Sequence, residues 1–245
     1  MRDIKLIALD MDGTLLNAQQ EVSMKTKEVL QQAMKEGVLV VLATGRHIST
    51  CEPYAKELHL NSFLVTTNGA EIHDNQSTLV EQHKIESESI EYLWKIAQHQ
   101  NVHAWMIASE KLFRGNRPDR FQDYTWLKMG FSNIEEEQKA EIIEQINQFG
   151  SFEITNSHPR NLEINQLGVH KAKALQSLCD KEGIQMNQVL SMGDSLNDYQ
   201  MIKQAGIGVA MKNAQDTILN VADAVTESNE NDGVARAVER FLWNK

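Results

Sequence analysis

The stretch that decides the fold is IKLIALDMDGT, residues 4–14. Residues 4–9 are almost all apolar, which is typical of a strand buried on both faces of a sheet. The run stops at Asp10, and Asp12 follows with Gly13, a residue that lets the chain turn sharply. Ligands of open parallel sheets bind beyond the carboxyl ends of the strands. The stretch therefore predicts a central strand that delivers two carboxylates to one pocket.

Helix and strand patterns alternate in the first and last parts of the chain. In the first part we expect a helix at residues 23–36, a strand at 38–43, a helix at 50–59, a strand at 63–67 and the turn pair Asn68-Gly69. In the last part we expect helices at 170–182, 198–205 and 233–242 and strands at 188–192, 207–210 and 224–225. This alternation predicts an α/β fold whose core is a doubly wound, Rossmann-like parallel sheet.

The middle of the chain has a different pattern and predicts an inserted domain. Two alternating stretches and an acidic helix pattern lie at residues 102–107, 126–131 and 135–149. We therefore assign residues 1–80 and 167–245 to the core and 81–166 to an inserted domain that mixes antiparallel strands with helices, an α+β arrangement. Three tryptophans there are expected to fill a small core, with substrate contact as the alternative: Trp94, Trp105 and Trp126.

Composition and charge exclude several classes of protein. The net charge of -10 argues against binding nucleic acid or anionic lipid through a broad basic surface, so an anionic ligand needs a local positive site. The longest apolar run, residues 38–43, is far below the roughly 20 residues that cross a bilayer. Cys51 and Cys179 fit neither a disulfide framework nor a zinc site. We expect a cytoplasmic protein without nucleic-acid or membrane partners.

A second acidic motif, GDSLND at residues 193–198, follows another predicted buried strand. Asp194 and Asp198 can place their oxygens on one side of a loop that enters a helix. Together with Asp10 they would form a hard, oxygen-rich site, which suits magnesium rather than zinc or copper. Asp198 taken alone has an alternative role as the residue that starts a helix.

Two further residues suit a phosphate ligand. Thr44 ends a predicted strand and precedes Gly45, so a hydroxyl and backbone N–H groups can hold phosphate oxygens. Lys171 lies at a predicted helix start, where its charge opposes the helix dipole. A bound phosphate accounts for that position, and a solvated surface lysine is the alternative.

These motifs, in this order, resemble those of the haloacid dehalogenase superfamily of phosphatases, and most closely its Cof-type branch with a large inserted cap. The segments that carry the resemblance are residues 10–14, 44–46, 171, 193–198 and 231–235. The resemblance implies a magnesium-dependent phosphomonoester hydrolase for small metabolites such as sugar phosphates, nucleotides or pyridoxal phosphate, acting as a monomer or small homo-oligomer. A phosphomutase and a non-catalytic ligand-binding protein on the same fold are the alternatives.

The resemblance also implies a role for each motif residue. Asp10 would be the nucleophile and form an aspartyl-phosphate, and Asp12 would protonate the leaving group and then deprotonate the attacking water. Asp10 and Asp194 would bind magnesium, helped by the Asp12 backbone carbonyl. Asp198 would ligate the metal directly or orient its waters. The groups implied to hold the transferring phosphoryl group are the Met11 and Gly45 backbones, Thr44, Lys171 and Asn197.

Specificity is expected to depend on the inserted cap, whose closing would exclude water from the site. A distal anionic group of the substrate could be met by three cap arginines, with a solvated loop as the alternative: Arg114, Arg117 and Arg120. Arg46 is expected to line the pocket or to brace its loop through an ion pair. His47 is expected to be structural.

Overall fold

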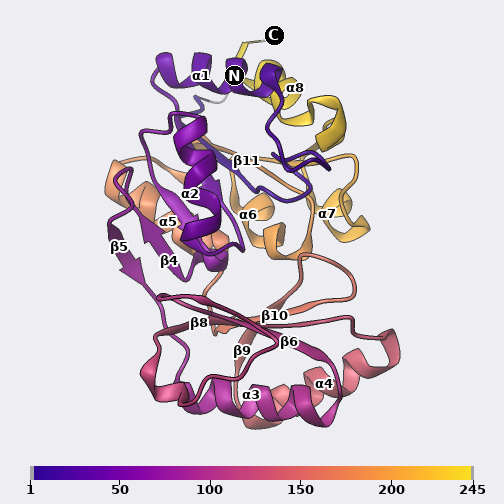
Figure 1. The fold of residues 1–245 in the computed structure, drawn as a ribbon. Helices are drawn as coiled ribbons and strands as arrows, with labels where there is room; N and C mark the ends of the chain where they lie inside the picture. Colours follow the sequence, from indigo (N-terminus) through magenta and orange to yellow (C-terminus); the bar gives the residue numbers. More distant parts are fainter. Residues whose placement is uncertain (1–2, 244–245) are drawn as a thin grey trace.

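The computed structural model describes residues 3–243, which form two β-sheets with helices packed around them (Figure 1). The larger sheet has eight strands in the order β13-β12-β11-β1-β2-β3-β4-β5. Its strands are β1 (Leu6–Leu9), β2 (Leu39–Ala43), β3 (Leu64–Thr66), β4 (Glu71–His73), β5 (Leu79–Gln82), β11 (Val189–Gly193), β12 (Ile207–Ala210) and β13 (Ala224–Val225). The five-stranded sheet, in the order β7-β6-β8-β10-β9, contains β6 (His103–Ala108), β7 (Leu112–Arg114), β8 (Trp126–Ser132), β9 (Phe152–Thr155) and β10 (Leu162–Gln166).

Helices cover both faces of the eight-stranded sheet. They are α1 (Met24–Lys35), α2 (Ile48–Glu57), α5 (Lys171–Glu182), α6 (Tyr199–Gln204), α7 (Asp216–Val221) and α8 (Gly233–Val238). Along β1, Ile7 and Leu9 belong to the core that α1, α2 and α8 share, whereas Leu6 and Ala8 face α5 and α6. Because side chains alternate across a strand, one fully buried strand supplies both hydrophobic cores.

The predicted α/β fold with a doubly wound core is confirmed. β1 pairs in parallel with β11 on one side and with β2 on the other. The sheet is not wholly parallel, because β4 and β5 extend one edge as an antiparallel hairpin. No long apolar run marks these strands, since they are short and carry polar residues such as Glu71, His73 and Gln82. A second difference is that α2 starts at Ile48, where the His47 side chain caps it by accepting a hydrogen bond from the Ser49 N–H.

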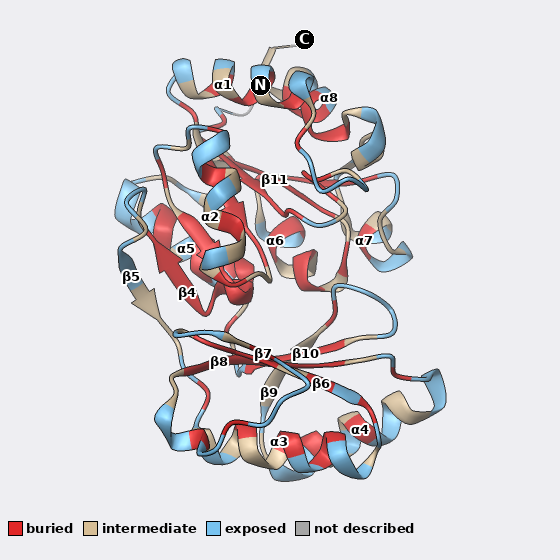
Figure 2. Ribbon diagram, in the orientation of Figure 1, coloured by how far each residue is buried: buried red, intermediate tan, exposed pale blue. Residues whose placement is uncertain are grey.

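The five-stranded sheet is antiparallel, and α3 (Ser87–His99) and α4 (Glu136–Phe149) cover the face that points away from the larger sheet (Figure 1). Buried residues line the strands and the inner sides of both helices (Figure 2). Trp94 and Trp126 lie in this core, as predicted, whereas Trp105 is only half-buried. The inserted segment is therefore the α+β unit that its pattern indicated.

The chain crosses between the sheets at residues 83–86 and again at residues 167–170. Because β5 belongs to the larger sheet, that sheet extends to Gln82. The domain limits at residues 80/81 and 166/167 stay a prediction. Within residues 3–243, no helix combines the length and the apolar character that a bilayer-spanning segment needs.

Candidate active site

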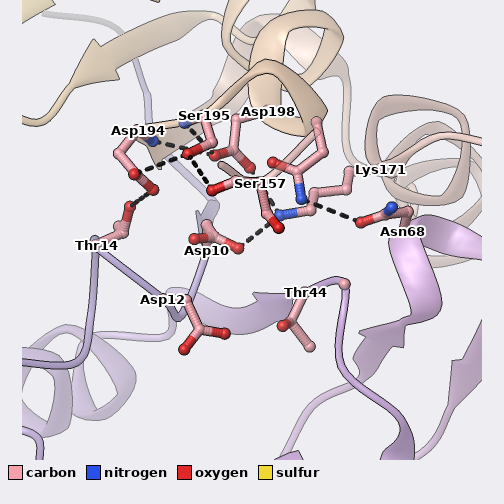
Figure 3. Close-up of polar contacts among 12 residues, drawn as sticks. Asp10, Asp12, Thr14, Thr44, Asn68, Ser157, Lys171, Asp194, Ser195 and Asp198 are labelled. Atoms are coloured by element: carbon pink, nitrogen blue, oxygen red, sulfur yellow. Dashed lines mark hydrogen bonds and ion pairs between the residues drawn. The ribbon is translucent and has the colours of Figure 1, made fainter. Parts of the chain in front are cut away.

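Three parallel strands deliver their next residues to the space between the two sheets. β1 is followed by Asp10, β2 by Thr44, and β11 ends beside Asp194. Since β1 lies between β2 and β11 in the sheet, these side chains meet at one sheet edge (Figure 3). Lys171 reaches the same place from the start of α5.

Lys171 is fully buried and lies between two carboxylates. Its Nζ donates a hydrogen bond to Asp10 Oδ1 at 2.5 Å and another to Asp198 Oδ1 at 2.7 Å. Burial alone lowers the pKa of the ammonium group, but the charges of Asp10 and Asp198 outweigh burial and raise the pKa of Lys171 above its usual value. The position of a lysine at a helix start is thus explained by partners within the site, and the solvated-lysine alternative is wrong.

Three carboxylates form a compact acidic cluster. Oxygens of Asp10, Asp194 and Asp198 all lie within 4.8 Å of one another. Burial, followed by the charge of Asp198, raises the pKa of Asp10 well above its ordinary value and that of Asp194 to about 7. These shifts mean that negative charge is poorly compensated here, which is the condition that a bound cation relieves. A donor set made only of carboxylate oxygens fits a hard divalent cation such as magnesium.

Asp198 also organises the loop around it. Its Oδ2 accepts hydrogen bonds from the backbone N–H groups of Asp194, at 3.0 Å, and Ser195, at 3.1 Å. Although Asp198 occupies the N-cap position of α6, its side chain makes no capping hydrogen bond to that helix. A Cβ at Gly193 would lie 2.4 Å from Asp198 Cγ, so only glycine allows this close approach. Asp198 is therefore at the start of a helix, as the alternative expected, and its side chain also contacts Lys171, so the two roles are combined in one residue.

The DMDGT turn brings two more of its residues to Asp194. Gly13 has φ +78°, and a Cβ there would lie 2.6 Å from Asp194 Oδ2. Thr14 Oγ1 donates a hydrogen bond to Asp194 Oδ1 at 3.3 Å. Glycine is needed at this position both for its backbone conformation and for the space that the carboxylate occupies. Met11 packs its side chain into the hydrophobic core, so any contact with phosphate would come from its backbone.

Asp12 lies apart from the acidic cluster, and Arg46 holds it there. Arg46 Nε donates a hydrogen bond to Asp12 Oδ2 at 2.8 Å, and its terminal nitrogen donates to Asp12 Oδ1. The hydrogen bonds to Asp12 raise the pKa of the guanidinium, so Arg46 stays charged. Arg46 therefore fulfils both of its predicted alternatives, since it forms an ion pair and also lines the pocket described next. The proposed Asp12 carbonyl ligand to magnesium stays a prediction.

A cavity of about 140 Å³ opens beside Asp10. Its lining includes Asp12, Gly45 and Asn197, which the sequence singled out. Thr44 lies behind Gly45 and is buried, with its Oγ1 accepting a hydrogen bond from the Arg46 N–H. Of the predicted phosphate-binding residues, Gly45 and Asn197 therefore line the small cavity, and all of the phosphate-binding roles stay predictions.

Sequence reasoning missed several residues of this cavity, and most of them come from the inserted cap. They are Lys128, Ser157, Glu163 and Ser195, whereas Trp105, which also lines the cavity, had substrate contact as its predicted alternative. Lys128 did have a signal, because it is a charged residue inside the apolar strand run WLKMGF, residues 126–131. A charge in such a run is expensive to bury unless it is paired.

A larger cavity of about 600 Å³ adjoins the small one and shares Arg46 and Trp105 with it. The other lining residues are Gln20, His47, Thr50, His103, Ile107, Leu112, Phe113 and Arg114. Of the three arginines considered for the cap, only Arg114 lines this cavity. Arg117 stacks on the Phe121 ring, and Arg120 lies 3.7 Å from Asp123 in an exposed ion pair.

Comparison with known proteins agrees with this fold. The chain matches the family model of the haloacid dehalogenase-like hydrolases over residues 7–137 and 116–238. It is 44% identical to 5-amino-6-(5-phospho-D-ribitylamino)uracil phosphatase YcsE of Bacillus subtilis (strain 168). The alignment of 240 residues covers 98% of this chain and 96% of that protein. A haloacid dehalogenase-like hydrolase from Bacteroides thetaiotaomicron has a TM-score of 0.82 at 30% identity, covering 97% of this chain and 99% of that chain. Another from B. subtilis has a TM-score of 0.90 at 24% identity, over 98% and 100% of the two chains, and shows the shared fold.

The chain therefore belongs to the haloacid dehalogenase-like hydrolases. Within that superfamily it is a phosphatase, and its substrate is a phosphorylated small molecule.

Proposed function

We propose that this phosphatase hydrolyses phosphomonoesters with magnesium through an aspartyl-phosphate on Asp10. The observation that carries the proposal is the buried arrangement of Asp10, Lys171 and the acidic cluster at the end of β1. Lys171 holds Asp10 Oδ1 in place, and its charge opposes the rise in the pKa of that carboxyl. Asp10 is thereby fixed next to a cavity that can hold a phosphoryl group, and Lys171 favours its ionised form.

The reaction runs in two displacements. A carboxylate oxygen of Asp10 attacks phosphorus, the ester P–O bond breaks, and the leaving oxygen takes a proton from Asp12. Asp12 then removes a proton from water, the water oxygen attacks phosphorus, and the bond to Asp10 breaks to release inorganic phosphate. Arg46 orients Asp12 through its two hydrogen bonds. Lys171, Asn197 and the backbone at Gly45 bind the phosphoryl oxygens.

Charge balance supports a magnesium ion in this mechanism. The site contains four carboxylates, and two of the cations that contact them are Lys171 and Arg46. Asp10, Asp194 and the Asp12 carbonyl would hold the ion, while Asp198 keeps Asp194 and Lys171 in position. When bound, magnesium supplies positive charge that offsets the carboxylates and polarises the phosphate ester.

The proposed substrate carries a planar ring and a phosphorylated chain, like 5-amino-6-(5-phospho-D-ribitylamino)uracil, the ester after which the 44% identical relative is named. The 600 Å³ cavity supports this choice, because Trp105 and Phe113 offer aromatic surface while Gln20 offers a polar amide. A ring in this cavity would leave the chain to carry the phosphate past Arg46 and Trp105 into the small cavity. We further propose a cytoplasmic enzyme, in keeping with its two buried free cysteines, that acts as a monomer or small homo-oligomer.

The test is release of inorganic phosphate by wild type and Asp10→Asn, each with magnesium or with excess chelator. The substrates are p-nitrophenyl phosphate, 5-amino-6-(5-phospho-D-ribitylamino)uracil, a sugar phosphate, a nucleotide and pyridoxal phosphate. We expect release only from wild type with magnesium, and the highest kcat/KM on the ribitylaminouracil ester. Equal activity of Asp10→Asn would contradict the mechanism. Transfer of phosphate to a second substrate without free phosphate would instead support a mutase.

A further inference from the structure

A buried ion pair from the cap enters the small cavity. Lys128 on β8 donates a hydrogen bond to Glu163 on β10, with Nζ and Oε2 2.8 Å apart. Both residues are almost wholly buried, and both line the cavity beside Asp10. The mechanism proposed above uses neither of them.

Lys128 also contacts the loop at residues 44–46 of the core, to which the proposed mechanism assigns phosphate binding and which we call the phosphate-binding loop. Its Nζ donates a second hydrogen bond, at 2.7 Å, to the backbone carbonyl of Gly45. A Cβ at Gly45 would lie only 3.0 Å from this Nζ and 2.9 Å from Asn68 Oδ1. The lysine therefore packs directly on the loop, with no room for a side chain between them.

Glu163 and its neighbour on β10 contact the turn at residues 67–69. Asn68 Nδ2 donates a hydrogen bond to Glu163 Oε2 at 2.7 Å, and Asn165 Nδ2 donates to the Thr67 carbonyl at 3.0 Å. Thr67, Asn68 and Gly69 all have positive φ, at 53°, 60° and 97°. Such a backbone costs free energy at each non-glycine residue, so it persists only where surrounding contacts fix it. The contacts from the cap are of that kind.

The turn at residues 67–69 also forms hydrogen bonds with residues of the proposed phosphate site. The Asn68 N–H donates to the Thr44 carbonyl, and the Thr67 N–H donates to the Arg46 carbonyl, each at 2.9 Å. Asn197 Nδ2 donates to Asn68 Oδ1 at 3.2 Å. A shift of the turn would therefore displace both the Thr44 loop and the Asn197 amide.

We propose that Lys128 and Glu163 are positioning residues through which the cap fixes the phosphate-binding loop of the core. Lys128 acts on the Gly45 carbonyl, and Glu163 acts through Asn68. The phosphate site is therefore complete only when the cap lies against the core as it does here. This inference rests on the proposed phosphatase mechanism.

The chemistry of the pair favours positioning over simple attachment of the cap. A buried ion pair is often no more stabilising than apolar residues of the same volume, because both charges lose their water. Apolar residues at positions 128 and 163 would therefore hold the cap against the core equally well. Burial lowers the pKa of Lys128, and the charge of Glu163 offsets this only in part. What apolar residues could not supply are the hydrogen bonds to the Gly45 carbonyl and the Asn68 amide.

The experiment compares Glu163→Gln, Lys128→Met and the charge-balanced double variant with wild type. Ser109→Ala is the matched control, because Ser109 Oγ donates a cap-to-core hydrogen bond to Glu71, at 2.6 Å, away from the phosphate loop. Two quantities are measured with saturating magnesium: kcat on p-nitrophenyl phosphate, and the Kd of orthovanadate by calorimetry. Thermal unfolding of each variant shows whether it is folded at the assay temperature.

We expect each pair variant to lower kcat by about 10²-fold, since a small misplacement of binding groups has effects of this size. We expect orthovanadate to bind about 10-fold more weakly to the same variants, and Ser109→Ala to stay within about 3-fold of wild type on both measures. Glu163→Gln is decisive because it removes a negative charge from the lining of the cavity that orthovanadate would enter while keeping the outline of the side chain. A purely electrostatic role predicts tighter orthovanadate binding, whereas positioning predicts weaker binding.

Three results would overturn the inference. They are tighter orthovanadate binding by Glu163→Gln, wild-type behaviour of the double variant, and equal losses in Ser109→Ala and the pair variants. If Lys128→Met does not fold, Glu163→Gln still decides the matter, since it changes no more than one atom of the side chain's outline. A wild-type protein that releases no phosphate and binds no orthovanadate would instead refute the proposed function itself.

Discussion

Two buried lysines meet at the small cavity, one from the core and one from the cap, and they differ in their partners. Lys171 contacts two carboxylates, and their charges raise its pKa despite its burial. Lys128 contacts one carboxylate and a backbone carbonyl, and burial lowers its pKa. The number of carboxylate partners therefore decides the direction of the shift. The core lysine is suited to control charge at the nucleophile, and the cap lysine to control geometry.

The largest effect is expected from Lys171→Met, which should lower kcat/KM by about 10³-fold because a charged group at the phosphoryl oxygens is lost. Lys171 also lowers the pKa of Asp10, so its removal raises that pKa and leaves less Asp10 ionised at neutral pH. The acid limb of the kcat/KM profile should therefore move to higher pH. Lys173→Met, on the exposed side of the same helix, is the control and should match wild type.

The same pH profile tests the contrast between the two lysines. Lys128→Met should lower the whole profile while leaving its acid limb in place, because Lys128 acts on the loop and not on Asp10. A shift of the limb equal to that of Lys171→Met would show that both lysines act through charge. The comparison of core and cap drawn above would then be wrong.

A second effect concerns stability of the metal-free protein and involves Asp194→Asn. The pKa of Asp194 is raised from 3.8 to about 7, chiefly by burial and then by Asp198. Between these pH values the folded state binds a proton that the unfolded state releases, so the unfolding free energy falls as pH rises. In chelator at pH 8, Asp194→Asn should be more stable than wild type by about 2 kcal/mol. Thermal denaturation against pH measures this, and parallel curves for the two proteins would contradict it.

A smaller effect is expected in the 600 Å³ cavity, where Trp105→Leu removes aromatic surface. KM for the ribitylaminouracil ester should rise about 10-fold, because stacking and burial of a ring are lost. KM for glycerol 3-phosphate, which has no ring, should change much less. Steady-state kinetics gives KM of wild type and variant for each ester. An equal rise of KM for both esters would show that the ring does not contact Trp105.

The smallest effects are expected from the cap arginines. Arg114→Ala should raise KM for the same ester about 3-fold, as expected for one partly solvated contact in the larger cavity. Arg117→Ala and Arg120→Ala should have no measurable effect, because Arg117 stacks on Phe121 and Arg120 pairs with Asp123 at the surface. A larger effect from either of these two would show that the cap moves them toward the substrate.

Local patterns in the sequence determined most of the core. A strand buried on both faces needs a continuous apolar run, and a carboxylate directly after it has few structural roles, so residues 4–14 indicated both the fold and the place of the candidate site. Asp194 and Asp198 could be grouped with Asp10 for the same reason, since parallel strands end at one edge, whereas Lys171 was indicated by its place at a helix start. The hairpin of β4 and β5 escaped prediction because its short polar strands carry no periodic signal.

Only the tertiary structure decided how the cap meets the core. The ion pair of Lys128 with Glu163 joins strands 35 residues apart, and the contact of Asn68 with Glu163 spans 95 residues. Contacts at these separations produce no periodic pattern in the sequence, because they depend on how two sheets pack and not on local conformation. The sequence alone determined which groups are candidates for the chemistry, since strand ends concentrate them. The packing of one sheet against the other decided which cap residues line the small cavity beside Asp10.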